Sequence, residues 1–224
     1  TLSASPTANN AILVAAIGAA ASQGGGMVRV PAGSWEITQV NLPARVRLRG
    51  EGDGVTTLRS QQAQAVITLG GDDAGLMDLT LDGLNANVGS IGVLSIGRKR
   101  TVMENVTVTR FAQGILMRGG DAPRLRNASV TLCTKGADLR GDRDALFTNT
   151  GGPLRDLDWN GGRITTCSSE GLRLSFEDDP VLRTTLRNIR FETNACPAVI
   201  VNGARAVLLE GCSWTGNTTN LQVT

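Results

Sequence analysis

Apolar and polar residues alternate over short stretches along most of this chain, and the alternation restarts at regular intervals. The recurring phrase is an apolar residue, one free position, a small polar residue or Gly, and then apolar, polar, apolar, as in residues 103–108. The central residues of its copies are Gly50, Asp78, Asn105, Asn127, Asp156, Asn188 and Gly211. Repeats spaced roughly 20–50 residues apart are typical of solenoids, in which each unit buries its apolar face against its neighbours.

A second phrase recurs along the chain at a constant offset from the first. Residues 92–97, 114–119 and 136–141 are short alternating segments bounded by Gly. Alternation with a period of two predicts β-strands, and the Gly and Asn residues between the segments predict turns. The sequence therefore predicts an all-β fold, a single-stranded parallel β-helix with one turn per repeat. Neighbouring turns would lie about 4.8 Å apart, the spacing of paired strands.

Residues 8–22 break this pattern. They are rich in Ala, and their apolar positions 12, 13, 16, 17 and 20 follow the period of an amphipathic helix. Thr7 or Asn9 is the expected N-cap, and the glycines at 24–26 are expected to end the helix. We expect this helix to cover the first open end of the β-helix. Residues 1–26 are thus predicted to form a cap helix and a Gly-rich link, and residues 27–224 one β-helical domain.

The segments that follow the helix resemble a known superfamily. An Ala-rich helix, a Gly-rich link, the sequence VRVPAGSW at 28–35 and the sequence VRLRGEG at 46–52 resemble the first turns of pectate-lyase-like right-handed β-helices. That superfamily includes polysaccharide lyases, polygalacturonase-type hydrolases and bacteriophage tailspikes. The resemblance implies a right-handed parallel β-helix of about seven turns. By resemblance to tailspikes alone, a homotrimer is expected.

The amino-acid composition limits the ligands and catalytic mechanisms that this chain could use. The net charge of +2 argues against general nucleic-acid affinity, and no stretch is long and apolar enough to insert into a membrane. The chain has no His and no Tyr, which excludes mechanisms that use either as acid or base. Cys133 and Cys167 are close enough in the predicted turns to pair or to remain free, whereas Cys212 is expected to be a buried thiol. Without close Cys pairs or His, no metal site and no cofactor are predicted.

Longer loops are the expected place for function, because insertions in a solenoid gather on one face. Two insertions, 142–153 and 176–185, fall on consecutive predicted turns and carry carboxylates. Carboxylates on neighbouring loops can approach the spacing that glycosidases use, about 5–9 Å. A solvated acidic loop with turn-forming Asp is the alternative interpretation. The candidate catalytic residues are Asp142, Asp144, Glu177, Asp178 and Asp179.

Arginines form a second candidate group. Aligning the repeats places Arg126, Arg155 and Arg187 at the same outward position of successive turns, with Arg190 beside them. Arg143 and Arg183 lie in the acidic insertions. Guanidinium groups bind carboxylates in a bidentate manner, so this stripe is a candidate site for an acidic polysaccharide. A solvated face with internal ion pairs is the alternative. The predicted substrate-binding residues are Arg126, Arg143, Arg155, Arg183, Arg187 and Arg190.

Three functional hypotheses follow. The first is a tailspike-like protein of a virion that binds a bacterial surface polysaccharide, either with or without cleaving it. The second is a secreted lyase or hydrolase that acts on an acidic polymer. The third is a structural spike or stalk, favoured by the low aromatic content of 3%. A virion or extracellular location is expected, and since the chain does not begin with Met, it is expected to be part of a longer polypeptide.

Overall fold

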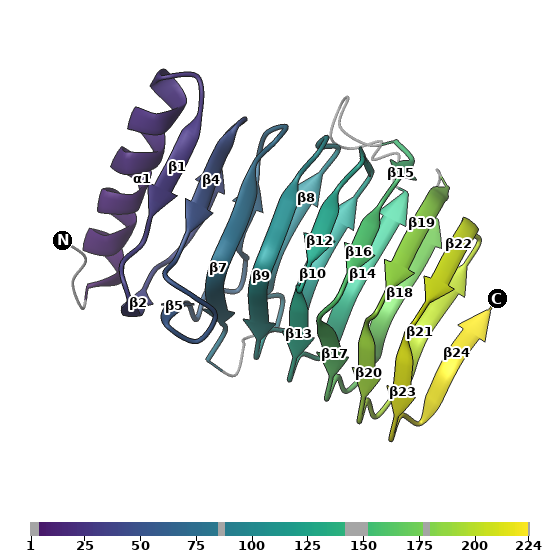
Figure 1. Cartoon of the computed structure of the whole chain (residues 1–224). Helices are drawn as coiled ribbons and strands as arrows, with labels where there is room; N and C mark the ends of the chain where they lie inside the picture. The colour runs from purple at the N-terminus through teal and green to yellow at the C-terminus, as the bar shows by residue number, and fades with distance from the viewer. Residues whose placement is uncertain (1–4, 85–87, 142–151, 177–179, 224) are drawn as a thin grey trace.

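The chain folds as a parallel β-helix of about seven turns with one helix at its N-terminal end, as the sequence predicts (Figure 1). The structure is a computed structural model and describes residues 5–84, 88–141, 152–176 and 180–223. The strands pair in parallel with the equivalent strands of the next turn and form a 16-stranded and an 8-stranded sheet. No helix in these ranges is long and apolar enough to cross a membrane.

Each turn contributes to three rows of strands. The first row comprises β1 (Gly26–Arg29), β4 (Val46–Arg49), the start of β7 (Gly75–Asp82), the start of β9 (Val102–Thr109), β11 (Gly120–Asp121), β12 (Arg124–Arg126), β15 (Leu154–Arg155), β16 (Asp158–Asn160), β19 (Val181–Arg187) and β22 (Arg205–Glu210). The second row comprises β2 (Gly33–Glu36), β5 (Thr56–Arg59), the ends of β7 and β9, β13 (Ser129–Thr131), β17 (Arg163–Thr165), β20 (Arg190–Glu192) and β23 (Ser213–Thr215). The third row is the 8-stranded sheet, with β3 (Val40–Leu42), β6 (Ala65–Leu69), β8 (Ile91–Ile96), β10 (Gln113–Arg118), β14 (Lys135–Gly141), β18 (Glu170–Phe176), β21 (Pro197–Asn202) and β24 (Thr219–Val223).

The small polar residue of each repeat forms the corner between the first and second rows. Asp78, Asn105, Asn127 and Asn188 all have φ near +50°, a left-handed conformation that Asn and Asp tolerate better than most residues. Their side chains bond to one another as a ladder: the Asn105 amide donates to Asp78 (2.8 Å), and the Asn127 amide donates to Asn105 (3.1 Å). The predicted structural role of this column is confirmed for these residues.

The core is a set of side-chain stacks that run along the helix axis. One stack in the first row contains Leu76, Met103, Leu125, Trp159 and Leu186, all fully buried. In the second row, Phe191 stacks on Trp214 with ring centroids 4.6 Å apart. Trp159 therefore belongs to the core, as predicted, whereas Trp214 is partly buried and packs against the core.

The register corrects one predicted repeat. Leu125 pairs with Trp159, so residues 159–164, and not 154–159, match the phrase at 125–130. Asp156 belongs to a different left-handed corner, where it lies against Arg183. An Asp favours a left-handed corner wherever one occurs. The sequence therefore revealed that a corner was present but not which of the corners it was.

The N-terminal helix α1 (Pro6–Ser22) covers the first turn, as predicted. It begins two residues earlier than expected, and Ser5, rather than Thr7 or Asn9, is its N-cap, since the Ser5 side chain accepts from the Ala8 amide. Pro6 suits the first helical position because its missing N–H would be unpaired there. Leu13 and Ile17 are buried against the first strands, and the buried Asn9 amide donates to the Glu36 carbonyl (2.8 Å).

Candidate functional site

The predicted catalytic carboxylates all fall in the two insertions after β14 and β18. Asp142, Asp144, Glu177, Asp178 and Asp179, together with Arg143, lie outside the described residues. The strands before them are described: β14 ends at Gly141, β18 ends at Phe176, and these two residues are paired. The chain therefore enters both segments from neighbouring positions on consecutive turns, and the catalytic role of these carboxylates stays a prediction.

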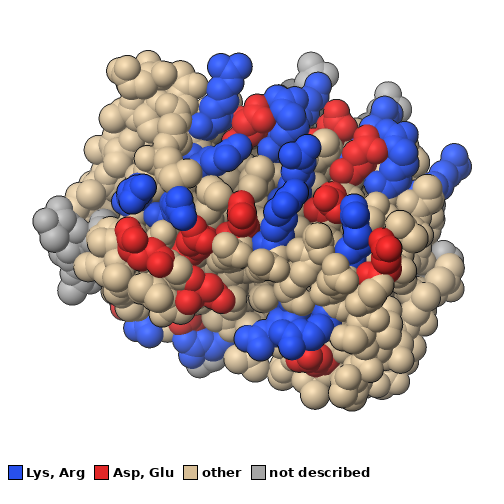
Figure 2. Space-filling view, in the orientation of Figure 1, with Lys and Arg blue, Asp and Glu red and all other residues tan. Residues whose placement is uncertain are grey.

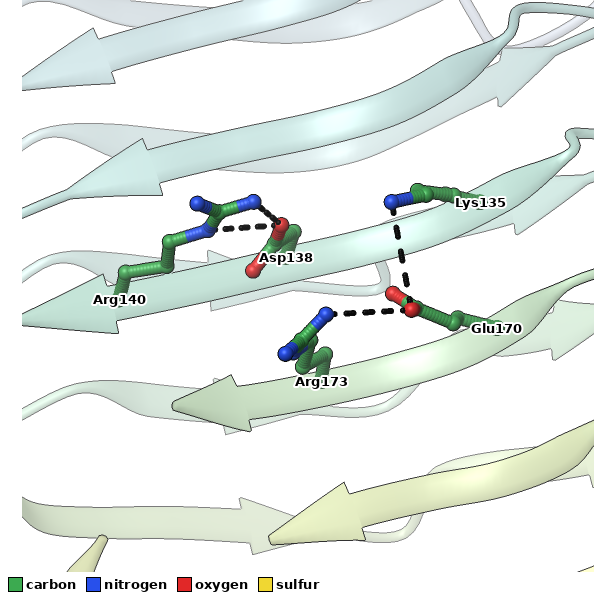
Figure 3. Close-up of polar contacts among 5 residues, drawn as sticks. All are labelled: Lys135, Asp138, Arg140, Glu170 and Arg173. Atoms are coloured by element: carbon green, nitrogen blue, oxygen red, sulfur yellow. Dashed lines mark hydrogen bonds and ion pairs between the residues drawn. The ribbon is translucent and has the colours of Figure 1, made fainter. Parts of the chain in front are cut away.

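The same two strands carry a charged cluster that the sequence analysis missed. We call Lys135, Asp138, Arg140, Glu170 and Arg173 the β14–β18 cluster (Figure 3). The register sets Lys135 opposite Glu170 and Asp138 opposite Arg173. The available signal was the segment 136–141, where charged residues alternate with apolar ones. Alternation predicted which side chains face outward, but it could not reveal which of them are buried.

Asp138 is a buried carboxylate, with only 1% of its side chain exposed. The Arg140 guanidinium lies beside it on the same strand, two residues further on, and its Nε donates to Asp138 Oδ2 at 2.8 Å (Figure 3). Residues i and i+2 of a strand share a face, which makes this contact possible. Burying a carboxylate is costly unless it is paired. Asp138 therefore positions Arg140 and is too deeply covered to contact a polymer.

Glu170 interacts with the other two cations of the cluster, Arg173 and Lys135. Its Oε1 accepts from Arg173 Nη1 at 3.2 Å and lies 4.0 Å from Lys135 Nζ (Figure 3). Glu170 is largely covered, whereas Arg173 and Lys135 are about one-third exposed. Three cations thus lie with two carboxylates, and the more exposed groups are the cations. The surface of the cluster presents N–H donors and a net positive charge.

The cluster is not fully satisfied internally. Asp138 Oδ1, Glu170 Oε2 and Arg173 Nε are covered atoms without a hydrogen-bond partner among the described residues. Buried polar atoms nearly always have a partner, so three such atoms in one cluster are unusual. Such atoms have free hydrogen-bonding capacity for a ligand group or for water.

The predicted arginine stripe is only partly assembled. Arg126 pairs in register with Glu104 and Asn160, and Asn160 pairs with Arg187. Arg155 is displaced from this column and lies between Asp121 and Leu182. The prediction that Arg126, Arg155 and Arg187 are stacked is therefore wrong, because the repeat around Arg155 was assigned to the wrong corner. Figure 2 shows basic side chains interspersed with acidic ones on this face.

Two of the predicted substrate-binding arginines on this face are neutralised within the protein. Arg187 lies 3.1 Å from Asp158, and Arg183 makes two bonds to Asp156, at 2.6 and 2.8 Å. The hydrogen bond from Arg183 holds the pKa of Asp156 below its usual value. These pairs match the alternative interpretation of a solvated face with internal ion pairs.

A groove runs along the corner between the first and second rows. Its volume is about 600 Å³, and it follows the outer side of the ladder. It is lined by Asp53, Asp78, Asn105, Asn127, Ser129, Gly162, Arg163 and Arg190. Of these residues, only Arg190 was predicted to bind substrate, and Arg163 was missed because the repeat that contains it was misaligned.

The four cysteines, Cys133, Cys167, Cys196 and Cys212, are free thiols, so the pairing of Cys133 with Cys167 is not formed. Burial raises the pKa of the Cys133 thiol to about 11, and it also raises the pKa of Cys167 and Cys196. Thiols with raised pKa values are poor nucleophiles at neutral pH. In the part of the chain that the structure describes, no three acidic, Cys or His side chains gather as a metal site.

Comparison with known proteins shows the fold. No known protein family profile matches the sequence, and a comparison with curated proteins finds no match. The tailspike protein gp49 of Acinetobacter baumannii bacteriophage Fri1, a capsular polysaccharide depolymerase, is similar in structure with a TM-score of 0.59 and 14% identity. The match covers 96% of this chain and 54% of gp49.

A GH87 α-1,3-glucanase from Streptomyces thermodiastaticus strain HF3-3 is similar with a TM-score of 0.58 and 15% identity. That match covers 89% of this chain and 43% of the glucanase. The chain thus spans about half of each protein or less. Identities this low show the fold alone. The likeness shows that the chain shares its parallel β-helix fold with the tailspike and the glucanase.

Proposed function

We propose that this chain binds a bacterial surface polysaccharide, as a tailspike-like protein of a virion, through the β14–β18 cluster. The observation that carries the proposal is that two covered carboxylates fix three cations: Asp138 holds Arg140, and Glu170 holds Arg173 and Lys135. Guanidinium groups fixed in this way lose little entropy when they donate to sugar hydroxyl or carboxylate oxygens. The likeness to a capsular polysaccharide depolymerase supports the ligand class.

Cleavage is the second part of the proposal. Gly141 and Phe176 are paired, so the segments with the predicted carboxylates leave the same end of the β14–β18 cluster. Loss of a catalytic carboxylate is expected to lower turnover about 100- to 10,000-fold. Reducing-end assays on Asp→Asn and Glu→Gln variants of Asp142, Asp144, Glu177, Asp178 and Asp179 test this part. If all five variants cleave as the native protein does, the catalytic assignment is wrong.

Binding is tested on an array of purified bacterial capsular and O-antigen polysaccharides. The double variant Arg140→Gln with Arg173→Gln is expected to bind the polysaccharides that the native protein recognises at least about tenfold more weakly. Arg124→Gln is the matched control, because Arg124 is an exposed arginine on the first row. Absence of binding to any polysaccharide on the array would favour a structural stalk. Equal binding by the double variant would place the site elsewhere.

Assembly is a separate proposal. We expect a homotrimer, by resemblance to tailspikes only. Light scattering of the purified chain measures its mass directly, and a monomer at micromolar concentration would contradict this expectation.

A further inference from the structure

The ladder at the corner between the first and second rows has a gap. Asn127 donates to Asn105, but at the next turn the ladder position is Gly161, which has no side chain. A Cβ atom at Gly161 would collide with Asn127 Oδ1, so this oxygen faces the glycine directly. The ladder resumes only with Asn188, whose amide donates to Asn160 (3.0 Å). Asn127 and Gly162, on either side of the gap, both line the 600 Å³ groove.

Two arginines lie in register next to this gap. Arg163 on β17 pairs directly with Arg190 on β20, so their side chains leave the sheet one turn apart. Paired strands are about 4.8 Å apart, and like charges directly opposite each other destabilise a sheet. Figure 2 shows basic side chains at the lower centre of the view, over β17.

These two arginines have little compensating negative charge. Within the described ranges, no carboxylate lies within ion-pair distance of Arg163. Arg190 Nε lies 3.9 Å from Glu192 Oε1, the one ion pair of Arg190 with a described residue, and 60% of the Arg190 side chain is exposed. By contrast, four arginines of the first row and its corners are paired with carboxylates at 3.1 Å or less, namely Arg49, Arg100, Arg183 and Arg187.

The other end of the groove carries a carboxylate, Asp53, that already accepts hydrogen bonds within the protein. Asp53 accepts from the Thr80 hydroxyl (2.7 Å) and from the Thr107 hydroxyl (2.8 Å), so both of its oxygens are used. The groove therefore has a fixed polarity, with carboxylates at the β5 and β7 end and guanidiniums at the β17 and β20 end. An anionic group in the groove would be drawn to the arginine end.

We propose that this groove binds an acidic glycan, with the carboxylate of one sugar unit held between Arg163 and Arg190. Each guanidinium can donate two parallel hydrogen bonds to a carboxylate, and the anion removes the repulsion between the two arginines. The amide of Asn127 and the hydroxyl of Ser129 line the same groove and suit sugar hydroxyls. The inference rests on the proposed function for its ligand class, but it uses a different face of the β-helix.

The test uses two soluble probes of equal length, an oligogalacturonate hexasaccharide and neutral maltohexaose, in isothermal titration calorimetry. The native protein is expected to bind the acidic probe at least about tenfold more tightly than the neutral one, with affinity that falls as salt rises. Arg163→Gln with Arg190→Gln is expected to remove this preference. Arg124→Gln with Arg205→Gln, two exposed arginines outside the groove, is the control and is expected to keep it.

Three outcomes overturn the inference: no binding of the acidic probe at millimolar concentration, equal binding of both probes, or an unchanged preference in the Arg163 and Arg190 double variant. The variant of Arg140 and Arg173 separates this site from the β14–β18 cluster. If that variant loses array binding but keeps the acidic preference, the two sites are independent. If the Arg140 and Arg173 variant loses the preference for the acidic probe and the Arg163 and Arg190 variant keeps it, the acidic glycan binds at the cluster and not in the groove.

Discussion

At the scale of single residues, the ladder asparagines have two separate functions in the fold. Asn105 has φ of +52° and makes two ladder bonds, whereas Asn127 has φ of +47° and makes one. A residue other than Gly, Asn or Asp in this conformation costs about 1–2 kcal/mol, and each lost hydrogen bond costs about 1 kcal/mol. The chain therefore uses one residue type both to turn the backbone and to connect the turns.

The first prediction follows from this difference. Asn127→Ala is expected to lower the free energy of unfolding by about 2 kcal/mol, and Asn105→Ala by about 3 kcal/mol. Urea denaturation measures both values. Ser129→Ala, next to the ladder, is the control and should change stability by less than about 0.5 kcal/mol. If both asparagine variants match this control, the ladder does not stabilise the fold.

A second prediction concerns how the stability of the fold depends on pH. The hydrogen bond from Arg100 lowers the pKa of Asp73, and that from Arg183 lowers the pKa of Asp156. A carboxyl with a lowered folded pKa stabilises the protein above its ordinary pKa of 3.8, and this stabilisation is lost as pH falls through the lowered folded value. Asp73→Asn with Asp156→Asn should therefore be less stable than the native protein at pH 6, with a smaller difference at pH 3. A difference in urea midpoint that is independent of pH would contradict this.

The sequence predicted a residue's role correctly where that role depends on the local backbone conformation alone. The corner asparagines were identified because a left-handed residue is a local requirement. Arg155 was misplaced because two corners of each turn accept the same residue types, and only the pairing of Leu125 with Trp159 decides between them. Asp138 was missed because its burial depends on the residues around it in three dimensions. A backbone conformation that a residue adopts for local reasons could be predicted from the sequence. The side chains that surround an outward-facing residue in the folded chain could not.

At the scale of elements, helix α1 closes the first turn. The sequence predicted its role because an amphipathic segment before a solenoid has one obvious surface to cover. Its start was less predictable, since Ser5, Thr7 and Asn9 are all suitable caps and only Ser5 is positioned to accept from the helix. Asn9 is used instead to bind the second strand row, through Glu36.

The helix offers a matched pair of variants. Ile17 is buried against the first turn, whereas Ile12 on the same helix is 39% exposed. Ile17→Asp is expected to lower stability by about 3 kcal/mol, because it removes a buried side chain and adds an unpaired carboxylate. Detachment of the helix would expose the unpaired edges of β1, β2 and β3, so association on size-exclusion chromatography should increase. Ile12→Asp is expected to behave like the native protein, and equal effects of both variants would show that α1 does not cover the turn.

At the scale of the whole molecule, burial is uneven along the axis. Side chains of the stacks are fully buried from Leu48 to Val199, whereas Leu221, which pairs with Val199 in the last turn, is 44% exposed. In a solenoid each turn gains stability mainly from its two neighbours. Stability should therefore vary along the axis, and the β14–β18 cluster should lie in a more stable region than the last turns.

Hydrogen exchange followed by mass spectrometry tests this gradient. Amides of β9, which has a partner strand on both sides, should exchange about two orders of magnitude more slowly than those of β24, which pairs only with β21. In the Ile17→Asp variant, protection should fall first in β1 and β4, next to the detached helix, and should persist in β14 and β18. That order would show that the turns around the β14–β18 cluster stay folded when the first turn loosens. Uniform exchange in both proteins would mean that the β-helix opens as one cooperative unit, and the neighbour-by-neighbour account of its stability would then be wrong.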